Sequence, residues 1–263
     1  MRSFKIITLG CKVNQAESEA LAQELNGRKW RPADIREQAD LCVINTCAVT
    51  RKAAQQSRQA VRRTIHENPG ACVVATGCCA RTDPAAFAAI EGLDHILGRT
   101  GPAELCALSG GGPEGCRCPN PPVPAACEPS FAAAAPAPSG KRTRPFFKIQ
   151  DGCDAFCAYC IVPYARGPSR SLPFEAAVAG IAALAAAGVP EVVLTGIHLG
   201  CYGRDLAPPS DLLGLLAAVH DLPGAIRVRL SSIEPLELSD AILALAAASE
   251  RFCRHFHVPL QSG

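Results

Sequence analysis

The segment KIQDGCDAFCAYCIVPYARG, residues 148–167, carries three cysteines in the spacing C-x3-C-x2-C. They are Cys153, Cys157 and Cys160, and an apolar run at residues 146–149 leads into them. Three thiolates can hold three irons of a [4Fe–4S] cluster and leave the fourth iron without a protein ligand. An open position on a metal is where chemistry takes place. The spacing therefore predicts a reactive iron–sulfur site; a zinc site or three unrelated thiols are the alternatives.

Strand-like and helical stretches alternate around and beyond this segment. Strands are predicted at residues 146–150, 192–195, 226–230 and 255–259, and helices at residues 173–187, 210–220 and 239–248. This alternation predicts the start of a (β/α) barrel, whose active-site residues follow the C-terminal ends of the strands. The three cysteines follow the first strand. Because the sequence ends at Gly263, directly after the fourth strand, we expect a partial barrel truncated there, in a fragment of a longer protein.

The N-terminal part of the chain alternates in the same way. Apolar, β-branched runs occupy residues 4–9, 41–45 and 71–76, and a weaker run occupies residues 95–98. We expect Asn14 and Glu17 to be an N-cap and its capping-box partner, and Gly27 to lie just beyond the helix end. The alternation predicts an α/β domain with a parallel, flavodoxin-like sheet that is covered on both faces.

A segment of different composition separates these two regions. Of the 32 residues at 109–140, 23 are Gly, Pro, Ala or Ser, which is typical of a linker. The predicted organisation is therefore an N-terminal domain at residues 1–108, a linker at 109–140 and the partial barrel at 141–263. The linker contains three cysteines, which can bind metal but are predicted to be free thiols: Cys116, Cys118 and Cys127.

Composition and charge exclude several classes of protein. The chain has 263 residues, a net charge of +2 and 48% hydrophobic residues, which is typical of a globular protein of two domains without a polybasic character. No signal-peptide core is present near the N-terminus, and no apolar run approaches the about 18 residues of a membrane span. Fifteen cysteines in such a chain indicate a cytoplasmic metalloprotein rather than a secreted disulfide scaffold.

A second set of three cysteines follows the predicted N-terminal strands: Cys11, Cys47 and Cys78. Ligands of open α/β sheets gather outside the carboxyl ends of the strands, so these thiols are predicted to meet and hold a second cluster. Small buried thiols at strand ends are the alternative. Cys79 is a rival ligand to Cys78, whereas Cys42 and Cys72 lie inside strands and are predicted to be core residues.

The residues beside this second set favour a cluster as well. Gly10 and Gly77 allow the backbone to approach it closely. Asn14, Asn45 and Thr46 can donate hydrogen bonds to its sulfurs.

Several of these motifs together resemble the radical SAM methylthiotransferases: GCKVNQAES at residues 10–18, NTCAVT at 45–50 and TGCCA at 76–80, followed by the three-cysteine segment. The similarity covers the chain outside residues 109–140. GCKVN, with LTGIHLGCYG at 194–203 and HVPLQSG at 257–263, is more similar to the MtaB branch than to the branches acting on isopentenyladenosine or on a ribosomal protein. In the family, the rest of a six-stranded partial barrel and an RNA-binding TRAM domain follow, neither of which this sequence contains.

The resemblance implies 2-methylthiolation of N6-threonylcarbamoyladenosine at position 37 of tRNA. It implies two [4Fe–4S] clusters and S-adenosylmethionine (SAM), because cofactor radical chemistry is needed to remove the unactivated C2 hydrogen. The cluster on Cys11, Cys47 and Cys78 would carry the methylated sulfur. The implied partners are the tRNA, a reducing electron donor of the flavodoxin or ferredoxin type and a sulfur donor. The alternatives are a sister enzyme acting on isopentenyladenosine, a non-catalytic zinc-binding RNA adaptor, and an inactive fragment.

Residues at the predicted barrel rim are candidates for SAM binding: Tyr159, Thr195, Gly196, Ser232, Glu234, Gln261 and Ser262. Thr195 and Gly196 match the family position that contacts the amino group of SAM. Each candidate can instead cap a strand end. His198 and His257 are predicted not to be metal ligands, because cysteines are available.

The stretch from Arg51 to Arg63 contains five basic residues and no acid: Arg51, Lys52, Arg58, Arg62 and Arg63. At about 100° per residue, Arg51, Arg58 and Arg62 share one helix face, and the opposite face is apolar. This predicts a helix that rests on the sheet and faces the phosphates of RNA, although an ordinary solvated face is the alternative. Lys141, Arg142 and Arg144 form a second, weaker basic patch.

Overall fold

A computed structural model describes residues 2–34, 36–98 and 142–261. The chain divides into two compact units. The first contains Met1–Ala132 and Cys157–Arg166, and the second contains Ala133–Phe156 and Gly167–Gly263. The predicted linker and its three cysteines lie outside the described residues.

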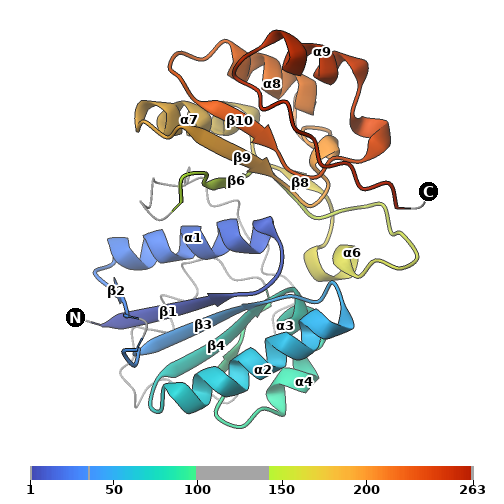
Figure 1. Ribbon diagram of the computed structural model, residues 1–263. Helices are drawn as coiled ribbons and strands as arrows, with labels where there is room; N and C mark the ends of the chain where they lie inside the picture. The colour runs from blue at the N-terminus through green and yellow to red at the C-terminus, as the bar shows by residue number, and fades with distance from the viewer. Residues whose placement is uncertain (1, 35, 99–141, 262–263) are drawn as a thin grey trace. The chain divides into compact units, whose positions relative to one another are not determined.

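The first unit is built on a parallel sheet with the strand order β2-β1-β3-β4-β5 (Figure 1). Its strands are β1 (Ser3–Thr8), β2 (Arg31–Pro32), β3 (Leu41–Thr46), β4 (Cys72–Gly77) and β5 (His95–Ile96). Its helices are α1 (Lys12–Gly27), α2 (Arg51–Glu67), α3 (Cys78–Thr82), α4 (Pro84–Ala88) and α6 (Val162–Arg166). This is the flavodoxin-like strand order, which confirms the predicted parallel sheet. The two-residue strand β2 is too short to leave a periodic pattern, and the sequence did not predict it.

Alternate residues of the central strands pack on opposite faces of this sheet. Val43 packs in one cluster with Leu25 of α1, and its neighbour Cys42 packs in another with Val61 of α2. The sheet is therefore covered on both faces, as predicted. Cys42 is fully buried and Cys72 packs at the edge of the α1 cluster, which agrees with their predicted core positions.

The start of α1 differs from the prediction. Cys11 is the N-cap and Asn14 lies inside the first turn of the helix. Asn14 does not cap, because its Nδ2 donates to the carbonyl oxygens of Leu9 at 2.8 Å and Thr46 at 3.1 Å. This side chain thus joins the ends of β1 and β3. Gly27 is the last residue of α1 rather than the residue beyond it.

The second unit contains a parallel sheet with the order β10-β9-β6 and a small antiparallel pair, β7 with β8. Its strands are β6 (Phe146–Lys148), β7 (Gln150–Asp151), β8 (Arg170–Ser171), β9 (Glu191–Thr195) and β10 (Arg227–Leu230). Its helices are α7 (Phe174–Ala186), η1 (Leu199–Cys201), α8 (Leu212–His220), η2 (Pro235–Glu237) and α9 (Asp240–Ala248). Parallel strands separated by α7 and α8 agree with the predicted start of a barrel.

The predicted strand at residues 255–259 does not form. Isolated parallel bridges at Phe252 and His257 attach this part of the chain to β10 and to the turn after it. Between the two bridges the backbone bends, and the N–H of His255 donates to the carbonyl of Cys253 at 2.7 Å. That bend interrupts the two-residue alternation that a continuous ladder requires.

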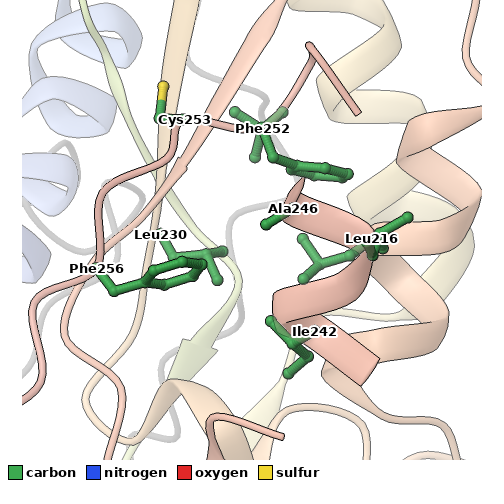
Figure 2. Close-up of a pocket in the computed structure, with 9 residues that line it drawn as sticks. Leu216, Leu230, Ile242, Ala246, Phe252, Cys253 and Phe256 are labelled. Carbon is green, nitrogen blue, oxygen red and sulfur yellow. The ribbon is translucent and has the colours of Figure 1, made fainter. Parts of the chain in front are cut away.

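Figure 2 shows the apolar contact between the sheet, α8, α9 and the segment after α9. A small cleft there is lined by nine residues, including Leu216, Ile242 and Phe252. Its volume of about 10 Å³ has room for about one water, so it is a gap in core packing and not a ligand site. Within the described ranges, none of the helices is long and apolar enough to cross a membrane.

Candidate iron–sulfur sites

The N-terminal set of cysteines lies at one edge of the first unit's sheet. Cys11 is the N-cap of α1 just after β1, Cys47 directly follows β3, and Cys78 begins α3 directly after β4. Strands β1, β3 and β4 are neighbours and run parallel, so their carboxyl ends meet at the same edge. In a sheet of this order that edge is where ligands bind, between β1 and β3.

Two glycines, Gly10 and Gly77, shape the backbone at this edge. A Cβ atom on Gly10 would lie 2.8 Å from the sulfur of Cys47, so the residue before Cys11 touches the second cysteine. A Cβ atom on Gly77 would lie 2.6 Å from the carbonyl oxygen of Thr46. Both glycines have φ values above +90°, a region that L-residues rarely adopt. A side chain at Gly10 would press on the thiol of Cys47, and one at Gly77 would press on the backbone of Thr46.

The three thiols have different surroundings. Cys11 is exposed, whereas Cys47 and Cys78 are each 5% exposed. Burial raises the pKa of the Cys78 thiol; the Arg166 guanidinium opposes this, and negative charge on Glu17 and Cys11 adds to it. A guanidinium, a carboxylate and a second thiol thus lie within electrostatic reach of Cys78.

Arg166 is a buried cation at this edge, and its role is not predicted from the sequence. Its side chain is 2% exposed, and Nη1 and Nη2 donate to the two carboxylate oxygens of Glu17 at 2.9 and 3.2 Å. Nη2 also donates to Oδ1 of Asn14, which lies 3.7 Å from Sγ of Cys11. Arg166 reaches the site because α6 packs against α3. Its position six residues after Cys160 is the only sequence signal that marks it.

The predicted hydrogen-bond donors to the sulfurs are used elsewhere. Asn14 donates to backbone carbonyls, Asn45 donates to the carbonyl of Asn14 at 3.0 Å, and Thr46 donates to the carbonyl of Thr76 at 2.6 Å. These donors hold the strand ends together, and Oδ1 of Asn14 also accepts a hydrogen bond from Sγ of Cys11 at 3.7 Å. Donation by these three residues to the sulfurs of a cluster stays a prediction.

Cys79, the rival of Cys78, points into the core. It is 1% exposed and packs in the apolar cluster with Val61 and Phe87. Burial raises the pKa of its thiol to about 11. Of these two neighbouring cysteines, Cys78 is therefore the one that fits a donor set with Cys11 and Cys47. Three thiols, a compensating guanidinium and a backbone without side chains at Gly10 and Gly77 fit an iron–sulfur cluster.

Cys153, Cys157 and Cys160 lie in the loop between β7 and α6. The pairing of β7 with β8 closes the base of this loop, and the N–H of Cys153 donates to the carbonyl of Gly167 at 3.1 Å. The N–H of Cys160 donates to the carbonyl of Cys157 at 2.9 Å, which forms a turn between the last two cysteines. Cys157 is exposed and the other two are half-buried.

Gln150 fixes the entrance of this loop, a role that the sequence analysis did not predict. Its fully buried side chain accepts hydrogen bonds at Oε1 from the N–H groups of Ile197 and His198, at 2.9 and 2.8 Å. Its Nε2 donates to Oγ of Ser169 at 2.9 Å. Gln150 thus ties the cysteine loop to the end of β9. A polar residue closing an apolar strand, three positions before Cys153, is the signal that marks it.

Thr195, Gly196, Ser232 and Glu234 of the predicted SAM contacts lie at or after the ends of β9 and β10, and Tyr159 is 74% exposed in the cysteine loop. Thr195 is 1% exposed, and a Cβ atom on Gly196 would lie 2.9 Å from Gln150. The Ser232 hydroxyl shares a 2.7 Å hydrogen bond with His257. Glu234 accepts a hydrogen bond from Gln261 at 3.4 Å, and Ser262 lies outside the described residues.

His198 stands in a cluster of groups after β9. Its Nε2 lies 2.8 Å from Oε1 of Glu237, and its Nδ1 lies 3.4 Å from Sγ of Cys201 and 3.5 Å from Sγ of Cys153. The hydrogen bond with Glu237 raises the pKa of His198. Burial, reinforced by the charge of Glu237, raises the pKa of Cys201 to about 11. A cavity of about 420 Å³ adjoins this group and is lined in part by His198, Cys201 and Arg204.

The predicted RNA-facing residues lie on α2, which buries Ser57, Val61 and Thr64 against the unit. Arg51, Lys52, Arg62 and Arg63 are exposed. The Arg58 side chain is 29% exposed and lies 3.9 Å from Asp83, and Arg63 pairs with Glu67 at 2.7 Å. In the second patch, Arg142 lies over the ring of Phe146, Arg144 lies 3.7 Å from Glu191, and Lys141 is outside the described residues.

Comparison with known proteins matches both regions of the chain. Residues 3–98 match the family described as Uncharacterized protein family UPF0004, and residues 147–263 match the Radical SAM superfamily. The Threonylcarbamoyladenosine tRNA methylthiotransferase MtaB of Bacillus subtilis is 37% identical over 264 residues, which is 100% of this chain and 58% of that protein. The tRNA-2-methylthio-N(6)-dimethylallyladenosine synthase of Syntrophomonas wolfei is 32% identical, over 99% of this chain and 59% of that protein. The chain thus spans less than two thirds of the length of these relatives.

Two solved structures share the fold. The radical S-adenosylmethionine methyltransferase TsrM from Kitasatospora setae, with cobalamin and a [4Fe–4S] cluster bound, superposes with a TM-score of 0.64 at 17% identity, over 98% of this chain and 61% of that chain. The cobalamin-dependent S-adenosylmethionine radical enzyme OxsB superposes with a TM-score of 0.58 at 11% identity, over 99% of this chain and 44% of that chain. At such identities the likeness shows the fold alone.

Proposed function

Because the chain belongs to the radical SAM methylthiotransferase family, we propose that it is the cofactor-bearing part of a tRNA methylthiotransferase. The proposed product is the 2-methylthio derivative of N6-threonylcarbamoyladenosine at position 37 of tRNA. The relatives named for that nucleoside are 33–37% identical to this chain, and those named for dimethylallyladenosine are 31–32% identical. Dimethylallyladenosine, which is the same nucleoside as isopentenyladenosine, is therefore the second candidate substrate.

One observation carries the proposal: the chain brings Cys11, Cys47 and Cys78 to one sheet edge in addition to the C-x3-C-x2-C loop. Two sets of three thiols can hold two clusters, each with an iron that has no protein ligand. When bound, the two clusters and SAM supply the radical chemistry that replaces an unactivated hydrogen with methylated sulfur. If the chain held a single cluster, one of the two sets of cysteines would hold no cofactor.

The residues of this chain are proposed to hold and orient the clusters and SAM. Gln150 fixes the cysteine loop to the end of β9, where Thr195 and Gly196 are proposed to contact the amino group of SAM. Arg166 holds Asn14 and supplies positive charge beside Cys78. The proposed partners are the tRNA, a flavodoxin- or ferredoxin-type electron donor and a sulfur donor, in the cytoplasm.

The first experiment counts iron, sulfide and zinc per chain after anaerobic reconstitution. We expect about eight irons for the wild type, and about four for the triple variant Cys11→Ala, Cys47→Ala, Cys78→Ala. Cys72→Ala, at a half-buried cysteine outside both sets, is the control and should keep all eight. Equal iron in the wild type and the triple variant would exclude the N-terminal cluster. Zinc without any iron would favour an RNA adaptor.

The second experiment decides the substrate and uses the complete protein that contains this chain. It is incubated with SAM, a reductant and tRNA carrying either threonylcarbamoyladenosine or isopentenyladenosine at position 37, and the nucleosides are identified by mass spectrometry. We expect the methylthio product from the threonylcarbamoyl tRNA. Product from the isopentenyl tRNA alone would transfer the proposal to the second candidate.

A further inference from the structure

Four side chains of the second unit meet beside the cysteine loop: Cys153, His198, Cys201 and Glu237. The two sulfurs lie 3.5 and 3.4 Å from the same imidazole nitrogen, Nδ1 of His198. The other nitrogen, Nε2, lies 2.8 Å from a carboxylate oxygen of Glu237. Cys201 has no part in the proposed methylthiotransferase chemistry, and the sequence analysis gave His198 no ligand role.

The two sulfur–nitrogen distances are those of neighbouring ligands in a tetrahedral zinc site. Zinc–sulfur bonds of about 2.3 Å and zinc–nitrogen bonds of about 2.0 Å separate neighbouring sulfur and nitrogen ligands by roughly 3.5 Å. A zinc-bound imidazole normally donates its second N–H to a carboxylate, which fixes the ring and raises its basicity. Glu237 occupies that place with respect to His198. Two thiolates also balance the charge of a divalent cation.

The site is accessible from a cavity, and one carboxylate oxygen beside it has no hydrogen-bond partner in the part of the chain that the structure describes. His198 and Cys201 line the cavity of about 420 Å³, which provides both an entry path and a fourth ligand position. Among the described residues, Oε2 of Glu237 is one of few buried side-chain oxygens without a hydrogen-bond partner. The guanidinium of Arg204 lies 3.7 Å from the other oxygen, Oε1, and offsets the carboxylate charge.

We propose that Cys153, Cys201 and Nδ1 of His198 form a site for a soft divalent cation, zinc, with Glu237 orienting the imidazole and the fourth position open to the cavity. Zinc binding itself depends only on these side chains. A second consequence rests on the proposed function: Cys153 also belongs to the C-x3-C-x2-C set, so zinc and the cluster on that set exclude each other. A zinc-loaded chain therefore cannot assemble that cluster.

The test titrates the iron-free, reduced chain with Co²⁺ and Zn²⁺ and counts tightly bound metal. Cys201→Ala and His198→Ala should each bind one equivalent less than the wild type, and lose one tetrahedral thiolate–cobalt signal. Cys253→Ala, at a cysteine of the same unit outside this cluster, should keep both. Glu237→Gln should weaken zinc binding by roughly 10- to 100-fold. An unchanged stoichiometry and spectrum in Cys201→Ala overturns the proposal.

A measurement on the unaltered chain guards against variants that misfold. With one equivalent of zinc, alkylation by iodoacetamide followed by mass spectrometry should show protection of Cys153 and Cys201, while the exposed Cys157 still reacts. Protection of Cys157 and Cys160 with Cys201 still reactive would place zinc on the loop cysteines instead and overturn the site.

Reconstitution then tests the exclusion. Wild-type chain loaded with zinc should take up about four irons fewer than metal-free chain, and Cys201→Ala treated in the same way should not. Full iron uptake with zinc retained would show that Cys153 does not bind the zinc, which overturns the site as proposed. If the metal-free chain binds no iron at all, the proposed function fails while the zinc stoichiometry still decides this inference.

Discussion

Arg166 and Glu17 are 149 residues apart in the chain and form a two-pronged ion pair in the first unit, at 2.9 and 3.2 Å. The guanidinium is 2% exposed and the carboxylate 25% exposed. Because a buried guanidinium without a counter-charge is costly, this pair holds α6 against α1 and α3. The segment that leaves the C-x3-C-x2-C loop is thereby anchored at the edge that carries Cys11, Cys47 and Cys78.

Removing the counter-charge should destabilise the first unit strongly. Glu17→Gln removes the carboxylate that pairs with the buried Arg166 guanidinium, and we expect the free energy of unfolding to fall by about 3 kcal/mol. Urea unfolding of the metal-free chain measures it. The control is Glu67→Gln, which breaks the exposed pair with Arg63 and should cost less than about 1 kcal/mol. Similar losses of stability at the two positions would contradict a structural role for the buried pair.

Much of the first unit was predictable, because its signals are local. The buried runs of β3 and β4 are continuous and apolar, and a cysteine directly follows each, so both the strands and the thiols at their ends could be inferred. The predicted N-cap at Asn14 failed for a physical reason. Its side chain serves two backbone carbonyls on different strands, a choice that depends on tertiary structure.

The groups that complete the sites were not predictable, because each depends on long-range contacts. Arg166 is an ordinary basic residue in sequence and becomes a buried counter-charge only when α6 packs on α3. Gln150 joins loops that are 47 and 48 residues away. Cys201 and Glu237 are 36 residues apart and meet only through the two turns η1 and η2.

Gly77 should tolerate no side chain. With φ of +93°, an added Cβ would lie 2.6 Å from the Thr46 carbonyl oxygen and 2.8 Å from its nitrogen. Gly70 has a similar φ of +88° but open space around it, which makes it a matched control for backbone strain alone. We expect Gly70→Ala to cost about 1 kcal/mol of unfolding free energy. Gly77→Ala should cost at least about 2 kcal/mol more, from overpacking.

Chemical denaturation of the two metal-free variants measures that difference, and iron content adds a second readout. Because Gly77 precedes Cys78, Gly77→Ala should also reduce iron uptake at the N-terminal set, whereas Gly70→Ala should keep the wild-type content. Equal unfolding free energies for the two variants would show that the backbone at Thr46 yields to the added methyl group.

Protonation of Glu191 should make the second unit less stable in acid. Its side chain is 12% exposed and lies 2.7 Å from Arg229. Burial acts to raise its pKa, but the hydrogen bonds with Arg229 and Cys253 and the charges of Arg229 and Arg144 together hold the pKa below its usual value. A lowered carboxyl pKa contributes stability above the unfolded value of about 4.3, and that contribution is lost as the pH falls through the folded value.

Comparing wild type with Glu191→Gln isolates this contribution. The variant should be less stable than the wild type at pH 7, and the gap should close as the pH falls below about 4. The exposed Glu91 provides the control, because Glu91→Gln should leave the stability difference small at every pH. A gap that is constant down to about pH 3 would mean that packing, and not the charge of Glu191, is responsible.

The basic face of α2 should contribute to tRNA binding by the complete protein. Arg62 is exposed, whereas Arg58 shares its charge with Asp83 at 3.9 Å, so Arg62→Gln should weaken binding more than Arg58→Gln. Removing one side chain that pairs with a phosphate should flatten the slope of log affinity against log salt by about one. Arg28→Gln, at the exposed end of α1 beside Glu24, is the matched control and should leave the slope unchanged. A protein that neutralises fewer phosphates must release fewer counterions. If the double variant Arg58→Gln, Arg62→Gln keeps the wild-type affinity and salt slope, α2 is therefore not part of the RNA interface.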